Sequence, residues 1–239
     1  MSGHSHAKTV MATKMANAAK KGKIYSKFGR LITIAAKEGG GDPAKNAKLK
    51  AVIDQAKNFN MPKENIERAI KKGTGELAGE NLEEISVEGF GPGGIALIIE
   101  GITDNTNRTL TEIKVTLNQN NGKMAGEGAV RWNFDRKGII IVLPEGKPQD
   151  ELEMIAIEAG ADDVKFYGET VEIHTKPEDL EQVRKILEEK GLKIDSFSLG
   201  WAAKEEVAIG EREKEQAEKL FEALDDNDAV NNVYSNLKE

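Results

Sequence analysis

The chain has 239 residues, of which 38% are hydrophobic and 31% charged, and it contains no cysteine. This length suffices for one large domain or for two to three small ones. The lack of cysteine excludes disulfides, thiol catalysis and cysteine-ligated zinc. No stretch has the apolar length of a membrane span and the first ten residues have no apolar signal core, so we expect a cytoplasmic protein without a membrane partner.

The net charge of −7 conceals a strong asymmetry. Residues 1–75 contain 16 Lys and Arg against 5 Asp and Glu, a balance of +11, whereas the remaining residues contain 18 against 36, a balance of −18. This pattern predicts a polyanion-binding module joined to an acidic body. The alternative interpretation is a lysine-rich solvated face, which is common on small helical domains.

The first 41 residues predict a tail and a helix. We expect residues 1–19 to form a mobile tail. His4 and His6 have no third ligand nearby, because His174 falls in a predicted strand, so we expect no metal site. From Lys20 the chain predicts a helix that ends at Gly39–Gly41, and its apolar stripe is Ile24, Phe28, Leu31 and Ala35.

A second and a third helix are predicted within 39–75. Asp42-Pro43 is typical of a helix start, and Asn60-Met61-Pro62 restarts the chain for the third helix, which stops at Gly73. The third helix has an apolar side and an opposite cationic side. The apolar residues are Ile66, Ala69 and Ile70, and the cations are Arg68, Lys71 and Lys72. We expect a three-helix bundle with one face free to bind anions.

The candidate nucleic-acid-binding residues all come from this basic segment. Lys23, Lys27 and Arg30 form a ridge beside the apolar stripe of the first helix. The full set is Lys14, Lys20, Lys21, Lys23, Lys27, Arg30, Lys63, Arg68, Lys71 and Lys72. Contacts of this kind to phosphates give affinity without sequence information. No pair of helices here resembles a helix-turn-helix, so base-specific readout is not predicted.

After a polar, glycine-rich linker at 73–81, two strands are predicted at 83–90 and 95–102. The glycines at 89–94 superficially resemble a phosphate cradle, but a strand follows them and no Gly-Lys-Ser/Thr is present, which favours a hairpin turn. A helix is predicted after the cap residues 104–107, with Arg108 as a local salt-bridge partner or an anion contact. A glycine-rich loop at 122–128 then leads to a predicted strand at 129–134 with Trp132 in a core.

From Gly138 the predicted order is β-α-β-β-α-β, the ferredoxin-like pattern. It lacks the basic and aromatic motifs of an RNA-recognition domain. A helix and a strand at 211–236 cannot stand alone, so we expect them to complete the domain that begins near residue 80. The predicted fold is therefore α+β: a basic helical domain (1–78), a discontinuous α/β domain (79–136 plus 202–239) and a ferredoxin-like insertion (137–201).

Four motifs carry a family resemblance: 39–75, GFGPGG at 89–94, TDNTNRT at 103–109 and FDRKG at 134–138. Together they resemble the YebC/PmpR family, which is related to the mitochondrial translational activator TACO1. The resemblance implies three domains and a regulator of gene expression that acts on nucleic acid. Family members are labelled DNA-binding transcriptional regulators, while others are similar to ribosome-associated translation factors that assist difficult peptide synthesis.

The resemblance and the residues together predict a non-enzymatic protein. No serine or threonine lies in a nucleophile elbow and no histidine is placed as a base. We expect DNA or ribosomal RNA as partner, with the ribosome as a further one, and a monomer without cofactor or small-molecule substrate. The chain departs from the family at its start: the usual Lys-Trp is His6-Ala7, and a Lys-His-Arg cluster is Met11-Ala12-Thr13, with Lys14 kept.

Overall fold

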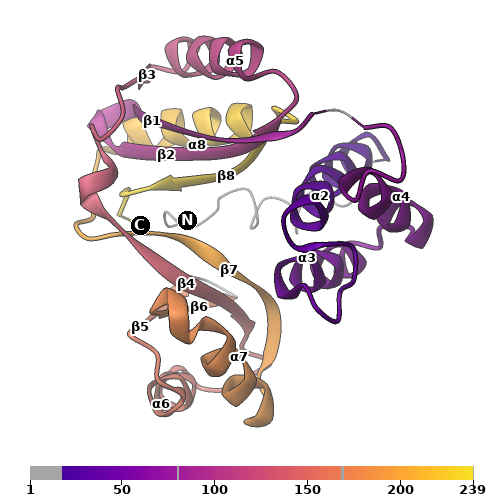
Figure 1. Cartoon of the computed structure of the whole chain (residues 1–239). Helices are drawn as coiled ribbons and strands as arrows, with labels where there is room; N and C mark the ends of the chain where they lie inside the picture. Colours follow the sequence, from indigo (N-terminus) through magenta and orange to yellow (C-terminus); the bar gives the residue numbers. More distant parts are fainter. Residues whose placement is uncertain (1–17, 80, 168–169, 239) are drawn as a thin grey trace.

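A computed structural model describes residues 18–79, 81–167 and 170–238 (Figure 1). It consists of three N-terminal helices and two antiparallel sheets, each with a pair of helices on one face. This arrangement confirms the predicted fold class of a helical unit followed by α/β units. In Figure 1 the helical unit lies beside the two sheets, which are stacked above one another between their helices.

The N-terminal helices are α2 (Ala18–Gly39), α3 (Ala47–Asn58) and α4 (Lys63–Gly73). The predicted stripe on α2 is confirmed, since Ile24, Phe28 and Ala35 are buried and Leu31 packs against the same core. Met61 and Ile66 contribute to that core from the turn before α4 and from α4 itself. The apolar residues of α2 recur at intervals of three and four residues, which places them on one side of the helix. Their packing with the apolar residues of α3 and α4 holds the three helices together.

The predicted start of the second helix at Asp42-Pro43 is wrong. The helix begins at Ala47, and its N-cap is Asn46, whose side-chain oxygen accepts the N–H of Leu49 at 3.0 Å. The Asn46 amide nitrogen also donates to the carbonyls of Ala35 and Gly40. One buried amide therefore satisfies the start of α3 and the end of α2, whereas the Asp42 side chain accepts the N–H of Ala44 in the turn that precedes α3.

The third helix is as predicted in its bounds: it follows Pro62 and its last residue is Gly73. Gly73 also has a packing role that the sequence did not reveal. A Cβ at this position would lie 2.3 Å from the carbonyl oxygen of Thr33, so only glycine lets α4 approach α2 this closely.

The first sheet has the strand order β3-β1-β2-β8. Its elements are β1 (Glu83–Phe90), β2 (Ala96–Thr103), α5 (Thr106–Gln119), β3 (Lys123–Met124), α8 (Glu211–Asp225) and β8 (Val230–Ser235). Strands β1 and β2 form the expected hairpin, joined by a 3-10 turn, η1 (Pro92–Gly94). Side chains of α5 and α8, among them Ile113 and Leu220, pack on one face of this sheet.

The second sheet has the order β5-β6-β4-β7, and every pairing in it is antiparallel. Its elements are β4 (Phe134–Leu143), α6 (Gln149–Ala159), β5 (Asp163–Tyr167), β6 (Thr170–Thr175), the 3-10 turn η3 (Pro177–Asp179), α7 (Leu180–Glu189) and β7 (Lys193–Ala203). Because β6 lies between β4 and β5, this is the predicted split β-α-β arrangement. The turn expected at Gly168-Glu169 lies outside the described residues.

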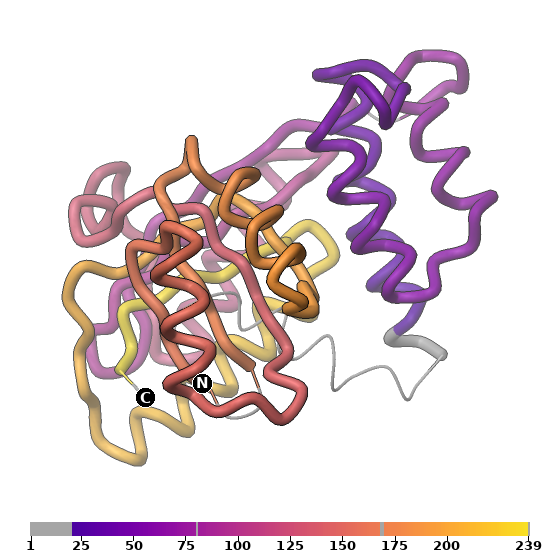
Figure 2. The backbone as a smooth tube through the Cα atoms, turned by 90° about the horizontal axis from the view of Figure 1, so that it is seen from below, coloured from indigo at the N-terminus to yellow at the C-terminus, as the bar shows by residue number. Residues whose placement is uncertain are grey.

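The two sheets meet through their helix-free faces. Ala96, Ile98 and Tyr234 of the first sheet pack with Phe134 and Ile139 of the second. Figure 2, seen from below, shows the same neighbourhood, with the three N-terminal helices to one side. Strand β8 pairs with β2 after the chain has passed through the whole second sheet. The domain division given above remains our proposal, and these pairings support it.

The predicted strand at 129–134 with Trp132 in a core is wrong. Residues 131–133 form a 3-10 turn, η2 (Arg131–Asn133), and Trp132 is 69% exposed. The cause is the buried Glu88, whose carboxylate accepts the backbone N–H groups of Gly128, Val130 and Arg131. This bends the segment so that Val130 and Phe134 face inward and Trp132 faces outward.

Candidate nucleic-acid interface

The cations of the basic ridge on α2 bind groups of the protein itself, at the end of α8. Lys27 Nζ lies 2.8 Å from Asp225 Oδ1 and 2.6 Å from the Asp225 carbonyl oxygen, at the C-terminal end of α8. Both side chains are buried, with 4% and 9% of their surface exposed. The structure therefore removes Lys27 from the surface that a phosphate could reach, contrary to the prediction for this residue.

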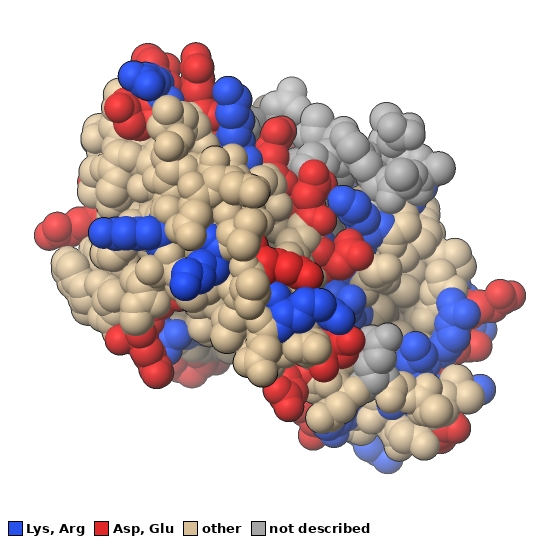
Figure 3. Space-filling view, turned by 90° about the horizontal axis from the view of Figure 1, so that it is seen from above, with Lys and Arg blue, Asp and Glu red and all other residues tan. Residues whose placement is uncertain are grey.

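The two flanking cations of the ridge contact the same end of α8. Lys23 pairs with Asp226 at 3.3 Å, and Arg30 donates to the carbonyl oxygen of Asp228 at 2.6 Å. The last carbonyls of a helix carry its negative dipole end, which attracts cations. In Figure 3 charged side chains of both signs are interspersed where the helical unit meets the first sheet. The ridge thus docks α2 onto the acidic body.

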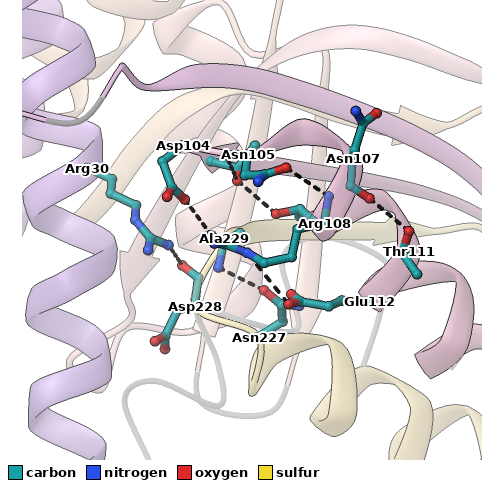
Figure 4. Close-up of polar contacts among 12 residues, drawn as sticks. Arg30, Asp104, Asn105, Asn107, Arg108, Thr111, Glu112, Asn227, Asp228 and Ala229 are labelled. Atoms are coloured by element: carbon teal, nitrogen blue, oxygen red, sulfur yellow. Dashed lines mark hydrogen bonds and ion pairs between the residues drawn. The ribbon is translucent and has the colours of Figure 1, made fainter.

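The TDNTNRT motif at 103–109 lies at this same junction (Figure 4). Asn105 caps α5 by accepting the N–H of Arg108, and Arg108 pairs with Asp104 at 2.6 Å. The N–H of Asp104 itself, then Arg108 and the more distant Arg30, hold the pKa of the Asp104 carboxyl below its usual range. Arg108 is therefore a local salt-bridge partner, the first of the two predicted roles.

The cations of α4 are placed differently, because Lys63, Arg68, Lys71 and Lys72 are all exposed. Lys63 lies 3.5 Å from Glu67, a pair that exposure makes weak. Arg68 donates to the neutral side chain of Asn65 at 2.6 Å. Within the part of the chain that the structure describes, no carboxylate forms an ion pair with Arg68, Lys71 or Lys72. These three keep their charge available for a ligand.

A groove runs between α2 and α4. It contains a cavity of about 400 Å³ that Arg30, Arg68 and Lys72 line, together with the polar side chains of Tyr25 and Asn65. A second cavity of about 370 Å³ continues from Lys72 past Lys37 toward the linker. We call the two cavities together the α2–α4 groove. Among the described residues, no carboxylate lines either cavity.

The groove contains only part of the predicted set. Arg30, Arg68 and Lys72 line it, whereas Lys71 lies on α4 outside the lining. Lys21 is exposed near the start of α2, while Lys14 and the side chain of Lys20 lie outside the described residues. Sequence reasoning missed Lys37, whose Nζ donates to Asn81 Oδ1 at 3.3 Å. Lys37 lies in the last turn of α2, three residues after Ile34 and seven residues after Arg30. This helical spacing, which places Lys37 on the same side as Arg30, was the signal available in the sequence.

The described residues contain neither a candidate metal site nor a candidate membrane-spanning helix. No group of three or more His, Asp and Glu side chains there could hold a metal ion. None of the helices in the described part is long and apolar enough to cross a bilayer.

Two family models together match most of the chain. Residues 5–76 match the TACO1/YebC protein N-terminal domain, and residues 82–237 match the TACO1/YebC second and third domain. The chain is 45% identical over 239 residues to a probable transcriptional regulatory protein of Thermoanaerobacter pseudethanolicus, covering 100% of this chain and 97% of the relative. It is 47% identical over 237 residues to another probable transcriptional regulatory protein, from Geobacter sulfurreducens, covering 99% and 96%.

A solved structure is similar over nearly its whole length. It is the crystal structure of a conserved hypothetical protein, Aq1575, from Aquifex aeolicus, with a TM-score of 0.88 and 40% identity. The match covers 95% of this chain and 93% of the other. The three-part architecture described above is thus shared with an experimentally determined relative.

Proposed function

The chain belongs to the TACO1/YebC family, and we propose that it is a non-enzymatic, DNA-binding transcriptional regulatory protein. Full-length relatives are named probable transcriptional regulatory proteins, which supports the transcriptional part of this role. The observation that carries the proposal is the α2–α4 groove, which several cations line and which no described carboxylate lines. Phosphate oxygens are the ligands that such a groove attracts.

The acidic body supports an oriented contact. Residues 76–239 carry a balance of −18, because 18 Lys and Arg face 36 Asp and Glu there. This charge repels phosphate, so a nucleic acid approaches the molecule from the side of α2 and α4. The docked ridge fixes that side relative to the two sheets, since Lys27 is held by Asp225.

A second candidate function is a ribosome-associated translation factor that binds ribosomal RNA. The favouring observation is that the cations lie in a cavity between two helices, whereas the usual readers of DNA bases insert a helix into the major groove. The aromatic side chain of this cavity, Tyr25, is tied by its hydroxyl to the carbonyl of Asn60 at 2.8 Å. Recognition by shape and backbone is the usual mode for folded RNA.

Titration in a salt series tests the groove. The triple variant Arg68→Glu, Lys71→Glu, Lys72→Glu should abolish binding to promoter-length duplex DNA. The matched control Lys45→Glu, Lys50→Glu, Lys57→Glu makes the same charge change on exposed residues outside the groove. This control should keep the slope of the logarithm of the binding constant against the logarithm of the salt concentration. The loss of each phosphate contact, in contrast, lowers the size of that slope by about 0.9. Equal losses in both triple variants would show that only overall charge matters.

A single-residue comparison is sharper. Lys72 lines both cavities of the groove and the adjacent Lys71 lines neither. Lys72→Glu should therefore weaken binding more than Lys71→Glu, although both residues are exposed on the same helix. Sedimentation with crosslinked ribosomes then separates the two candidate functions. Tight DNA binding without ribosome association supports the first, and ribosome association without DNA binding at low salt supports the second.

A further inference from the structure

A second cleft, of about 620 Å³, lies between the two sheets. It is separate from the α2–α4 groove. The sheets meet through the contacts of Phe134, Ile139 and Tyr234 and diverge toward α3, which closes the far side. Apolar side chains from all three parts of the protein line it, including Val52, Ile102 and Phe197. Its volume is in the range of sites that bind ligands.

The charged lining of this cleft has an excess of carboxylates. Glu84, Glu100, Glu178 and Glu181 line it together with only two cations, Lys48 and Arg136. Both cations are already paired. Lys48 lies 2.8 Å from Glu38 and 3.2 Å from Glu84, and Arg136 lies 3.0 Å from Glu100. Glu181 is paired as well, with Arg184 at 3.0 Å, and this arginine lies over the ring of Phe197. Four carboxylates against two cations still leave the lining negative, so a cationic ligand is favoured here and a phosphate backbone is not.

One wall of the cleft is the outer edge of β7. This strand ends the strand order of the second sheet, and no described strand pairs with its outer side. The carbonyls of Asp195 and Phe197 point outward, because they accept the side-chain amides of Asn58 and Gln55 from α3. Antiparallel pairing alternates every second residue, so the backbone of Leu199 also faces outward. In the described part of the chain the α3 amides bind only the Asp195 and Phe197 carbonyls of this edge, and Leu199 is 44% exposed.

We propose that this cleft binds an extended, cationic peptide segment of a partner protein, which adds as a strand to the outer edge of β7. Backbone hydrogen bonds to the edge at Leu199 supply affinity that does not depend on sequence. In an extended peptide successive side chains point to opposite sides. Carboxylates and apolar side chains line both walls of the cleft, for example Glu100 beside Ile102 on β2 and Glu178 beside Leu180 at the start of α7, so alternating apolar and Lys or Arg residues find both kinds of contact. This binding is independent of the proposed function.

Calorimetric titration of the full chain tests the proposal. The probe is a blocked peptide of about nine residues, within the usual length of a strand, in which Lys and Val alternate. A peptide with alternating Glu and Val and an oligolysine of equal charge are the controls. Of the three peptides, we expect only the Lys-Val peptide to bind saturably. Binding of none of them, or equal binding of either control, would overturn the proposal.

Two further variants localise the contact. Leu199→Lys adds a cation and bulk to the edge and should reduce affinity at least tenfold. Val115→Lys is the matched control, since Val115 is 46% exposed on α5 and outside the cleft. N-methylation of alternate peptide amides should weaken binding, because it removes the edge hydrogen bonds. Affinity unchanged by N-methylation or by Leu199→Lys would refute strand addition.

Fluorescence gives an independent readout. The indole Nε1 of Trp201 donates to Glu100 Oε1 at 2.8 Å, so it reports on the lining of the cleft. In a Trp132→Phe background Trp201 is the only tryptophan. Its emission should change during titration with the Lys-Val peptide, and the midpoint of that change should equal the midpoint of the calorimetric titration. An equal response to duplex DNA would overturn the assignment of the cleft to a peptide.

Discussion

Replacing Lys27 by methionine should destabilise the docking of α2 strongly. The ammonium group lies 2.8 Å from Asp225 Oδ1 with both side chains buried, so its removal leaves a buried carboxylate beside the negative end of α8. Breaking a buried pair by removing one partner costs about 3–5 kcal/mol. Methionine fills a similar volume, which confines the change to the charge.

Lys23 provides the matched comparison on the same ridge. Its pair with Asp226 spans 3.3 Å, but the side chains are 46% and 67% exposed. Exposed pairs contribute about 0–1 kcal/mol, so Lys23→Met should be nearly neutral. Urea unfolding followed by circular dichroism, with hydrogen exchange of the α2 amides, measures both variants under the same conditions.

The result also separates two roles of the ridge. If Lys27 is a docking residue, Lys27→Met lowers stability and leaves the salt dependence of nucleic-acid binding by the folded protein unchanged. A Lys27→Met variant that unfolds within about 1 kcal/mol of the parent would refute the reasoning. So would a salt slope that falls by the amount of one phosphate contact.

Three further outcomes follow from the fold. Burial raises the pKa of Glu88, but three backbone N–H groups and Arg131 outweigh it and hold this pKa below its usual range. Its contribution to stability is therefore complete above about pH 4.3 and is lost as pH falls through the lowered pKa, so Glu88→Gln should flatten the acid limb of the stability curve; an unchanged limb would contradict this. Gly73→Ala should cost about 1–3 kcal/mol in urea unfolding through its clash with the Thr33 carbonyl, whereas Gly22→Ala, where a Cβ meets nothing within 4 Å, should stabilise α2. Trp132→Ala should change stability by less than about 0.5 kcal/mol, and acrylamide should quench Trp132 readily in a Trp201→Phe background; strong protection from acrylamide would restore the predicted core position.

Features that depend on neighbours in sequence could be predicted. The apolar stripe of α2 and the cationic side of α4 follow from helical spacing alone, as does the order of elements after Gly138. Even for such local features, a second residue nearby can take the predicted role. Asp42-Pro43 is a plausible helix start, but Asn46 caps α3 because its amide also reaches the end of α2.

Features that depend on distant contacts could not be predicted. The partner of Lys27 lies 198 residues away, and spacing along α2 cannot show that its ridge faces a protein carboxylate instead of a phosphate. Trp132 was expected in a core as part of a strand at 129–134, yet its direction is set by the carboxylate of Glu88, more than 40 residues earlier. The grouping of Lys37 with Lys72 likewise requires the close approach of α2 and α4.

The return of β8 to pair with β2 imposes an order on events during synthesis. Strand β8 leaves the ribosome after the second sheet, so β2 has an unpaired edge while that whole sheet is made and can fold. An unpaired strand edge is a template for aggregation. The acidic residues at 225–228 emerge equally late, and until then the α2 ridge is undocked. A nascent chain therefore presents both a bare strand edge and an open cationic helix, and a truncation before residue 225 makes that transient state permanent.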